Sequence, residues 1–205
     1  KWHPIGGQPR PEILCELSDL IADMENTELR LAPDETAYII NLTGAEAEKV
    51  QEVIFSDQAG TLFETSVSCI GASICQVGLR DSQELLWKCV KAVRQAEIPD
   101  GALPQIHISG CTSSCGTHQT GVMGFRGAVK NVDGKPQPAY IFYINGCERQ
   151  GQEQFGYEAG TMLAEVIPAF LVELGQTVAA SGMDYSNWHQ MHAQELEALA
   201  EKYLG

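Results

Sequence analysis

The sequence predicts an α+β fold in which helices cover one face of a mostly antiparallel sheet. Short segments with alternating or continuous apolar residues have the length of strands, and longer segments with apolar residues three and four apart are typical of amphipathic helices. The 205 residues have ordinary apolar and charged contents, 44% and 20%, so the chain is expected to bury a sizeable core.

The N-terminal part predicts two helices and two strands. The first helix covers 12–24 and follows prolines at positions 9 and 11. Two strands, 28–32 and 36–42, are joined by a "PDE" turn. A second helix is expected over 44–54.

The next part carries one helix and three strands. A capped amphipathic helix is expected over 81–97, and one side of it is predicted to be buried: Leu85, Leu86, Cys89, Val90 and Val93. The segment 104–109 reads as a strand. The segments 121–132 and 138–146 flank a "DGK" turn and predict paired strands.

The C-terminal part is predicted to be helical. A long helix is expected from Glu158, interrupted by Pro168. After the small-residue linker "AASGM", a final helix over 184–203 is expected to serve as a docking or interface element.

Charge and hydropathy exclude two classes of protein. The net charge of −14 argues against a nucleic-acid-binding protein, because phosphate binding needs clustered Lys and Arg. No apolar run approaches the roughly 20 residues that span a bilayer, so a cytoplasmic protein is expected. The chain begins with lysine, which is typical of a piece of a longer protein.

Four cysteines stand in two pairs within Gly- and Ser-rich segments. "SCIGASICQVG" holds Cys69 and Cys75, and "SGCTSSCGTHQTG" holds Cys111 and Cys115. In a cytoplasmic chain such pairs indicate metal ligands before disulfides. The C-x5-C and C-x3-C spacings suit an iron–sulfur cluster better than zinc, which favours C-x2-C in both halves. Zinc and four unremarkable thiols remain the alternatives.

The other three cysteines are expected to have structural roles. Cys15 and Cys89 are assigned to the apolar faces of helices, where a free cysteine behaves as a small hydrophobe. Cys147 follows a strand, and we interpret it as a structural thiol or a neighbour of the ligands.

The order C-x5-C, then G-C-x3-C and a "GxxGFxG"-like strand, resembles the siroheme-dependent nitrite and sulfite reductases. The likeness runs from "ELRL" to about residue 175 and is closest at 69–75 and 110–127. It implies a [4Fe-4S] cluster held by the four paired cysteines, with Cys115 also bridging to the siroheme iron.

The resemblance also implies a domain organisation. The chain would be the C-terminal half of such an enzyme: a ferredoxin-like half domain over 1–62, a cluster- and siroheme-binding α/β domain over 63–178, and a helical extension over 179–205.

Siroheme carries eight carboxylates, so its pocket needs cations and hydrogen-bond donors. Thr112 and Ser113 stand where the family commonly has Pro-Asn. The candidate contacts lie near the motifs: Arg80, Thr112, Ser113, Ser114, His118, Arg126 and Asn145. For His118 and Arg80, a plain loop or surface role is the alternative.

The basic substrate residues of the family are missing. The strand "PQPAYIFYING" has no lysine where a "KxK"-like pair is expected, which leaves Arg30, His118 and Arg126 as candidate catalytic residues. We therefore expect an incomplete reductase of nitrite or sulfite that needs its other half or a second subunit and a reduced donor such as ferredoxin. The alternative is an electron-transfer or metal-binding module without catalysis.

Overall fold

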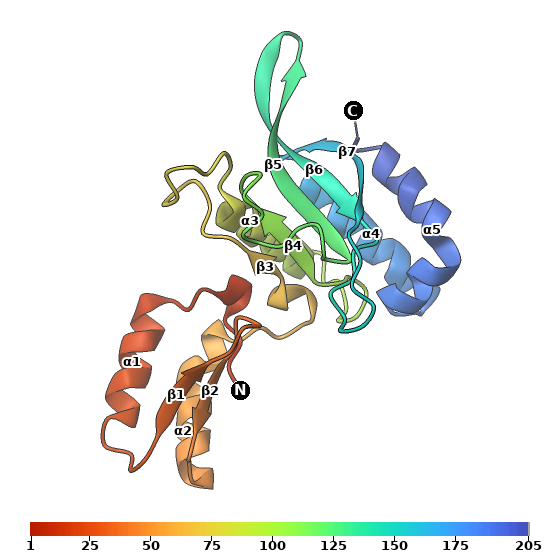
Figure 1. Ribbon diagram of the computed structural model, residues 1–205. Helices are drawn as coiled ribbons and strands as arrows, with labels where there is room; N and C mark the ends of the chain where they lie inside the picture. Colours follow the sequence, from red (N-terminus) through yellow and green to blue (C-terminus); the bar gives the residue numbers. More distant parts are fainter. Residues whose placement is uncertain (205) are drawn as a thin grey trace. The chain divides into compact units, whose positions relative to one another are not determined.

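The computed structural model describes residues 1–204 and divides the chain into two compact units, Lys1–Gly60 and Thr61–Gly205 (Figure 1). This division lies two residues before the predicted boundary, and residues 179–205 are part of the second unit. In the described part of the chain, no helix is long and apolar enough to cross a membrane.

The first unit packs two helices against a two-stranded sheet. Helix α1 (Pro11–Ile21), strands β1 (Glu28–Leu31) and β2 (Ala37–Ile40), and helix α2 (Gly44–Ile54) follow one another. The strands are antiparallel, and Thr43 and Glu46 cap α2 reciprocally. The buried cluster consists of Trp2, Ile13, Leu17, Ala37, Val50 and Ile54.

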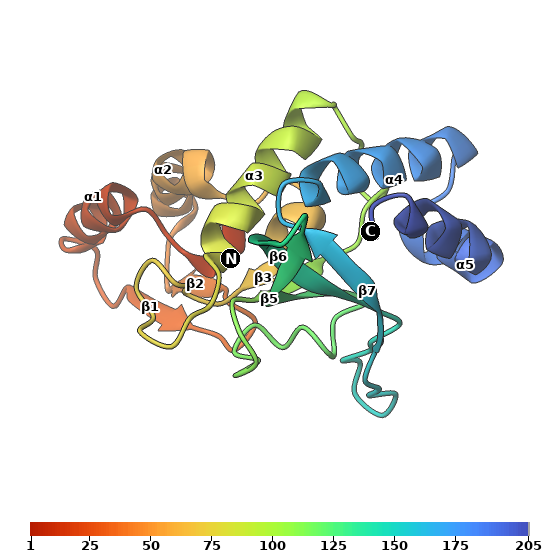
Figure 2. The ribbon, with the colours of Figure 1, turned by 90° about the horizontal axis from the view of Figure 1, so that it is seen from above.

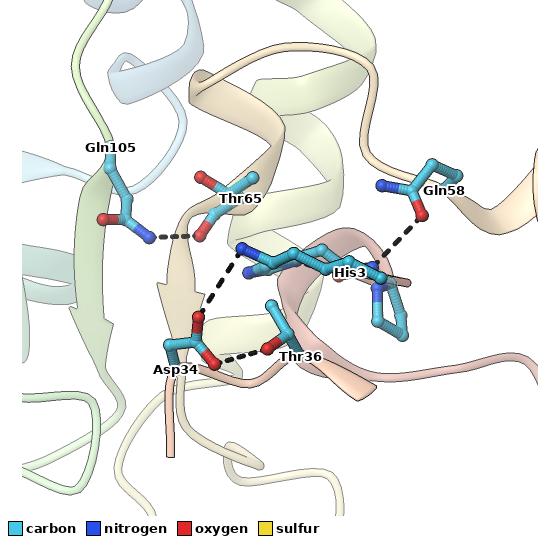
Figure 3. Close-up of polar contacts among 8 residues, drawn as sticks. His3, Asp34, Thr36, Gln58, Thr65 and Gln105 are labelled. Atoms are coloured by element: carbon cyan, nitrogen blue, oxygen red, sulfur yellow. Dashed lines mark hydrogen bonds and ion pairs between the residues drawn. The ribbon is translucent and has the colours of Figure 1, made fainter. Parts of the chain in front are cut away.

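Polar contacts fix the N-terminal segment of this unit (Figure 3). The His3 backbone N–H donates to the Gln58 side chain at 3.2 Å, and Lys1 Nζ lies 3.7 Å from Asp34. Asp34 also accepts a hydrogen bond from the Thr36 hydroxyl. Two short 3-10 helices, Ile5–Gly7 and Phe55–Asp57, complete the unit.

The second unit is built on a five-stranded sheet in sequential order. Its strands are β3 (Val67–Ser68), β4 (Ile106–Ser109), β5 (Met123–Val132), β6 (Lys135–Ile144) and β7 (Tyr157–Leu163). The β3–β4 and β4–β5 pairs are parallel, whereas the longer β5–β6 and β6–β7 ladders are antiparallel. The predicted α+β class is confirmed.

Three helices accompany this sheet: α3 (Ser82–Gln95), α4 (Ile167–Ser181) and α5 (Tyr185–Glu201). A 3-10 turn, Phe63–Thr65, precedes β3. Figure 2 shows α3 and α4 over one face of the sheet and the connecting loops on the opposite side. On the helix side, the Phe142 ring lies between two other rings. Its centroid is 5.1 Å from that of Phe125 and 5.3 Å from that of Phe170 on α4.

Strand alternation sends the intervening side chains to the other face. His107 and Ser109 alternate with the fully buried Ile106 and Ile108, and Tyr143 and Arg126 alternate with the core phenylalanines. We call this surface the loop face. It is where the second cysteine pair lies.

The predicted long helix from Glu158 is wrong. Residues Tyr157–Leu163 form β7, and α4 begins only at Ile167, with Pro168 in its first turn. Proline suits that position because the first helical N–H groups have no intrahelical partner. Gly160, at φ +152°, has a backbone conformation that helices do not use.

Burial corrects one cysteine assignment and confirms another. Cys89 is fully buried on α3 together with the four apolar residues predicted beside it. Cys15 is exposed, because it lies two residues from both Ile13 and Leu17 and therefore on the opposite side of α1.

Candidate functional site

The first cysteine loop leaves β3 and returns to the start of α3. Cys69 continues the strand, with its N–H donating to the Ile108 carbonyl at 3.0 Å. Cys75 lies in a tight turn, where its N–H donates to the Gly71 carbonyl at 2.8 Å. Gly71 has φ +75°, and a Cβ there would lie 2.8 Å from the Ser82 nitrogen, so this turn requires glycine.

The second cysteine loop leaves β4 and folds back over the loop face. Ser114 and Thr117 have positive φ angles of 59° and 48°. The Gly116 N–H donates to Ser109 Oγ at 3.1 Å, and a Cβ on Gly116 would lie 2.1 Å from the Ile108 carbonyl oxygen. The backbone of this loop is thus pressed onto β4.

The two loops are joined at Gly110. Its carbonyl accepts the N–H groups of Leu79 and Arg80 at 3.2 and 2.9 Å, and its own N–H donates to Cys69 Sγ at 3.1 Å. Because Cys111 is the next residue, one cysteine of each pair lies at this junction.

Polar groups lie close to the two sulfurs at the junction. Cys69 Sγ is 3.1 Å from Ser82 Oγ as well as from the Gly110 amide. Hydrogen bonds from Ser113 hold the pKa of Cys111 below its usual value. Amide and hydroxyl donors aimed at sulfur favour the deprotonated thiol, the form that binds metals.

The two loops supply four free thiols as candidate metal ligands. Within residues 1–204, no three His, Cys, Asp or Glu side chains gather closely enough to hold one metal ion. The thiolates of a cubane cluster bind separate irons, so they need not meet at one point. The four-cysteine ligand set stays a prediction.

Two predicted site residues, His118 and Arg126, come together on the loop face. His118 is buried, its Nδ1 lies 3.0 Å from Ser109 Oγ, and its ring packs edge-on against Tyr143. The Arg126 guanidinium carbon lies 5.6 Å from the centre of the same Tyr143 ring. Burial, with the Arg126 charge, lowers the pKa of His118 to about 4, so the ring is neutral at pH 7.

Arg126 is already paired with a carboxylate. Its Nη2 lies 3.2 Å from Glu158 Oε1, the same oxygen that accepts the Tyr143 hydroxyl at 2.6 Å. Burial and this hydrogen bond raise the pKa of Tyr143 to about 12. In the described part of the chain, the buried Arg126 Nε–H has no hydrogen-bond partner.

Tyr143 and Glu158 were not predicted as site residues. The strand register brings them together: Gly124 on β5 pairs with Tyr143 on β6, and Tyr143 pairs with Glu158 on β7. Tyr143 in turn contacts the His118 ring. The helix predicted from Glu158 concealed this pairing.

Four other residues predicted to contact siroheme lie on the two cysteine loops. The Arg80 guanidinium donates to the Ala128 and Leu79 carbonyls at 2.8 and 3.1 Å, which ties the first loop to β5. Thr112 and Ser113 are exposed on the second loop, and Ser114 is half-buried beside them.

Asn145 and Arg30 are found in other surroundings. Asn145, at φ +66°, follows β6 and lines a cavity of about 800 Å³ with Cys147. Arg30 lies in the first unit, exposed on β1 and paired with Glu28 at 2.9 Å.

Comparisons with known proteins find relatives named as nitrite and sulfite reductases. No family model matches. The chain is 26% identical over 176 residues to the chloroplastic ferredoxin–nitrite reductase of Arabidopsis thaliana, covering 81% of this chain and 29% of the relative. It is 23% identical over 195 residues to the assimilatory ferredoxin-dependent nitrite reductase of Haloferax mediterranei, covering 91% and 33%.

A sulfite reductase component is also similar in sequence, and a solved structure is similar in fold. The sulfite reductase [NADPH] hemoprotein beta-component of Bacillus licheniformis is 24% identical over 118 residues, covering 52% of this chain and 20% of the relative. The structure of the Mycobacterium tuberculosis NirA protein superposes with a TM-score of 0.69 at 17% identity, covering 83% of this chain and 33% of that chain.

These relatives confirm the predicted resemblance at low identity. The chain spans a third or less of the length of the curated relatives that it matches.

Proposed function

We propose that this relative of the nitrite and sulfite reductases is the siroheme- and [4Fe-4S]-binding half of such an enzyme, with nitrite-to-ammonia or sulfite-to-sulfide reduction as its reaction. The observation that carries the proposal is the junction at Gly110. There two cysteine loops far apart in sequence share the Gly110 carbonyl, and the Gly110 amide donates to the Cys69 sulfur.

Cys69, Cys75, Cys111 and Cys115 would hold the cluster, and Cys115 would also bind the siroheme iron. When bound, the cluster and siroheme supply one-electron transfers to an anion at the siroheme iron. The protein's part would be to favour the thiolate of Cys111 and to orient the second loop through Ser109 and the Gly116 amide.

The cluster of His118, Arg126, Tyr143 and Glu158 would then bind the substrate or the siroheme carboxylates. Neutral His118 is a hydrogen-bonding group and adds no positive charge, and Arg126 contacts the same Tyr143 ring. An incoming carboxylate or oxyanion would compete with Glu158 for the Arg126 guanidinium.

We favour nitrite over sulfite because "HQTGVMGF" resembles the nitrite-type members slightly more. A reduced ferredoxin is the donor that we propose, as the names of the nitrite reductase relatives suggest.

The test is an absorption spectrum of the anaerobically purified chain, with iron and acid-labile sulfide counts. Siroheme gives an intense Soret band and bands in the red, and a [4Fe-4S] cluster gives about four irons and four sulfides per chain. A colourless, zinc-containing protein would contradict the proposal.

The second candidate is an iron–sulfur module without catalysis of its own. It is favoured because Arg30 and Arg126 are both neutralised by glutamates, and because the chain carries a net charge of −14. Broad absorption near the blue without Soret or red bands would select this candidate.

A further inference from the structure

Strand β1 is an open edge of the two-stranded sheet in the first unit. The far side of β2 is occupied, because Ala37 and Trp2 exchange backbone hydrogen bonds of 2.8 and 2.7 Å. Ala37 therefore turns its N–H and C=O away from β1, and Leu31, which lies opposite it, turns its own away from β2. This orientation recurs at every second residue of the strand, so Leu29 does the same. Within residues 1–204, the outward groups of Leu29 and Leu31 have no hydrogen-bond partner.

The helix face of the sheet continues past this edge as uncovered apolar surface. Leu29 and Leu31 lie opposite Ile39 and Ala37, of which Ala37 belongs to the buried cluster and Ile39 packs against it. Leu29 is 39% exposed and Leu31 is 83% exposed. A further strand beside β1 would cover both leucines, and a sheet of two strands gains most from such an addition.

The other face of β1 carries one charge of each sign. Glu28 and Arg30 are exposed and lie on the same face, with Arg30 Nη2 2.9 Å from Glu28 Oε2. The segment Glu-Leu-Arg is complementary to itself. When two copies run antiparallel about a two-fold axis at Leu29, each Glu28 lies opposite an Arg30 and the two Leu29 residues lie opposite each other.

Other registers of the same pairing are disfavoured. An axis at Glu28 or at Arg30 would place that residue opposite itself, and like charges directly opposite are destabilising. An axis at Leu31 would place Leu29 opposite Pro33, which has no N–H. An axis between two residues would oppose Leu29 to a residue whose backbone groups already bond to β2.

We propose that β1 pairs antiparallel with β1 of a second copy of this chain, about a two-fold axis at Leu29. Each Leu29 then donates its N–H to, and accepts from, Leu29 of the other copy, and the two sheets become one. The leucines cover each other on the helix face, and Glu28 and Arg30 form an ion pair on each side of the axis on the open face.

This pairing involves the first unit and no cofactor, so it goes beyond the proposed function and does not rest on it. Because β1 is only four residues long, the dimer is expected to be weak and to depend on protein concentration. The charges then decide the register, and the backbone and the leucines supply the attraction.

The first experiment is sedimentation of the whole chain at concentrations up to about 1 mM, together with amide hydrogen exchange. A dimer should form as the concentration rises, and exchange at the Leu29 and Leu31 amides should slow in parallel. A monomer at every concentration, or a dimer in which these amides stay unprotected, would overturn the proposal.

The second experiment reverses the charges. Glu28→Arg and Arg30→Glu each place like charges opposite twice per dimer, so each should raise the dissociation constant about tenfold. A mixture of these two variants should pair as well as the wild type, because every arginine then faces a glutamate.

A double variant and a control complete this series. Glu28→Arg combined with Arg30→Glu in one chain keeps the pair within the strand and should restore the dimer. Glu48→Arg, exposed on α2, is the charge-matched control and should dimerise like the wild type. A dissociation constant that is the same in all these variants would place the interface elsewhere and overturn the proposal.

The rival occupant of the edge is a strand from the rest of the enzyme. If addition of that part dissociates the dimer and protects the Leu29 and Leu31 amides in its place, the edge belongs to it and the second copy is excluded. A chain that binds no siroheme would overturn the proposed function and leave these measurements unaffected.

Discussion

Burial makes ionisation of the Glu35 carboxyl unfavourable in the folded chain. Its Oε2 is buried without a hydrogen-bond partner among the described residues, and a Cβ on Gly7 would lie 2.3 Å from that oxygen. Burial raises its pKa from 4.5 to about 7. The folded chain therefore holds this proton more tightly than the unfolded chain does.

The sign of the pH effect follows from that difference. Below about pH 4.5 both states are protonated and Glu35 has no effect on stability, whereas between 4.5 and about 7 the free energy of unfolding falls as pH rises. Glu35→Gln should thus stabilise the chain by roughly 1 to 3 kcal/mol at pH 8 and by little at pH 4. Urea unfolding at both pH values measures this, with exposed Glu52→Gln as the control. Equal effects at the two pH values would exclude the burial explanation.

Two cysteine substitutions distinguish a proposed cluster ligand, Cys115, from a buried core residue, Cys89. Cys115→Ser should lower the iron content and abolish multi-electron reduction, because it removes the proposed shared ligand. Cys89→Ser should leave the iron content unchanged and cost roughly 1 to 3 kcal/mol, because it puts a hydroxyl at a fully buried position. Iron analysis and urea unfolding of both variants make the comparison. The same iron loss in both variants would contradict the assignment.

The residues predicted from sequence were those close to a motif. His118 lies just after the second cysteine pair and Arg126 lies on the strand that follows it, so the motif itself drew attention to them. Tyr143 and Glu158 are distant in sequence, and only the strand register brings them to the same ring and guanidinium. A single sequence contains no signal for that register.

At the scale of elements, periodicity identified α1, α2, α3 and the β5–β6 hairpin, because each has a long run with one clear period. It failed for β7, which precedes an apolar helix without a strong break in pattern. It also missed β3, whose two residues are stabilised by pairing with β4 and have no pattern of their own.

The packing of β5 against the cysteine loops gives an element-scale prediction. A Cβ on Gly127 would lie 2.2 Å from the Gly110 carbonyl oxygen, the atom that joins the two loops. Gly127→Ala should therefore displace the junction, destabilise the chain by roughly 1 to 3 kcal/mol and reduce iron binding. Unfolding and iron titration measure both effects. Gly44→Ala, with no atom within 4 Å of the new Cβ, is the control, and wild-type iron binding by Gly127→Ala would refute the role of the junction.

At the scale of the whole molecule, charge limits what this chain does by itself. It spans a third or less of its curated relatives, and its net charge is −14. Reduction of a small oxyanion needs cations aimed at the oxygens where charge accumulates, and loss of one such donor costs about 100- to 1,000-fold in rate. Of the candidate residues, Arg30 is paired with Glu28, Arg126 is paired with Glu158, and His118 is neutral at pH 7.

We therefore expect the cofactor-loaded chain alone to reduce nitrite or sulfite at least 100-fold more slowly than the chain supplied with the rest of the enzyme. The assay uses reduced viologen as donor and a range of protein concentrations, since a second copy that contributed Arg30 would make the rate rise with dimerisation. Glu158→Gln tests the charge argument within the chain, because freeing Arg126 should raise the residual rate or tighten anion binding. Full activity from a demonstrated monomer would show that the substrate site lies within these residues, and the interpretation of the chain as half an enzyme would be wrong.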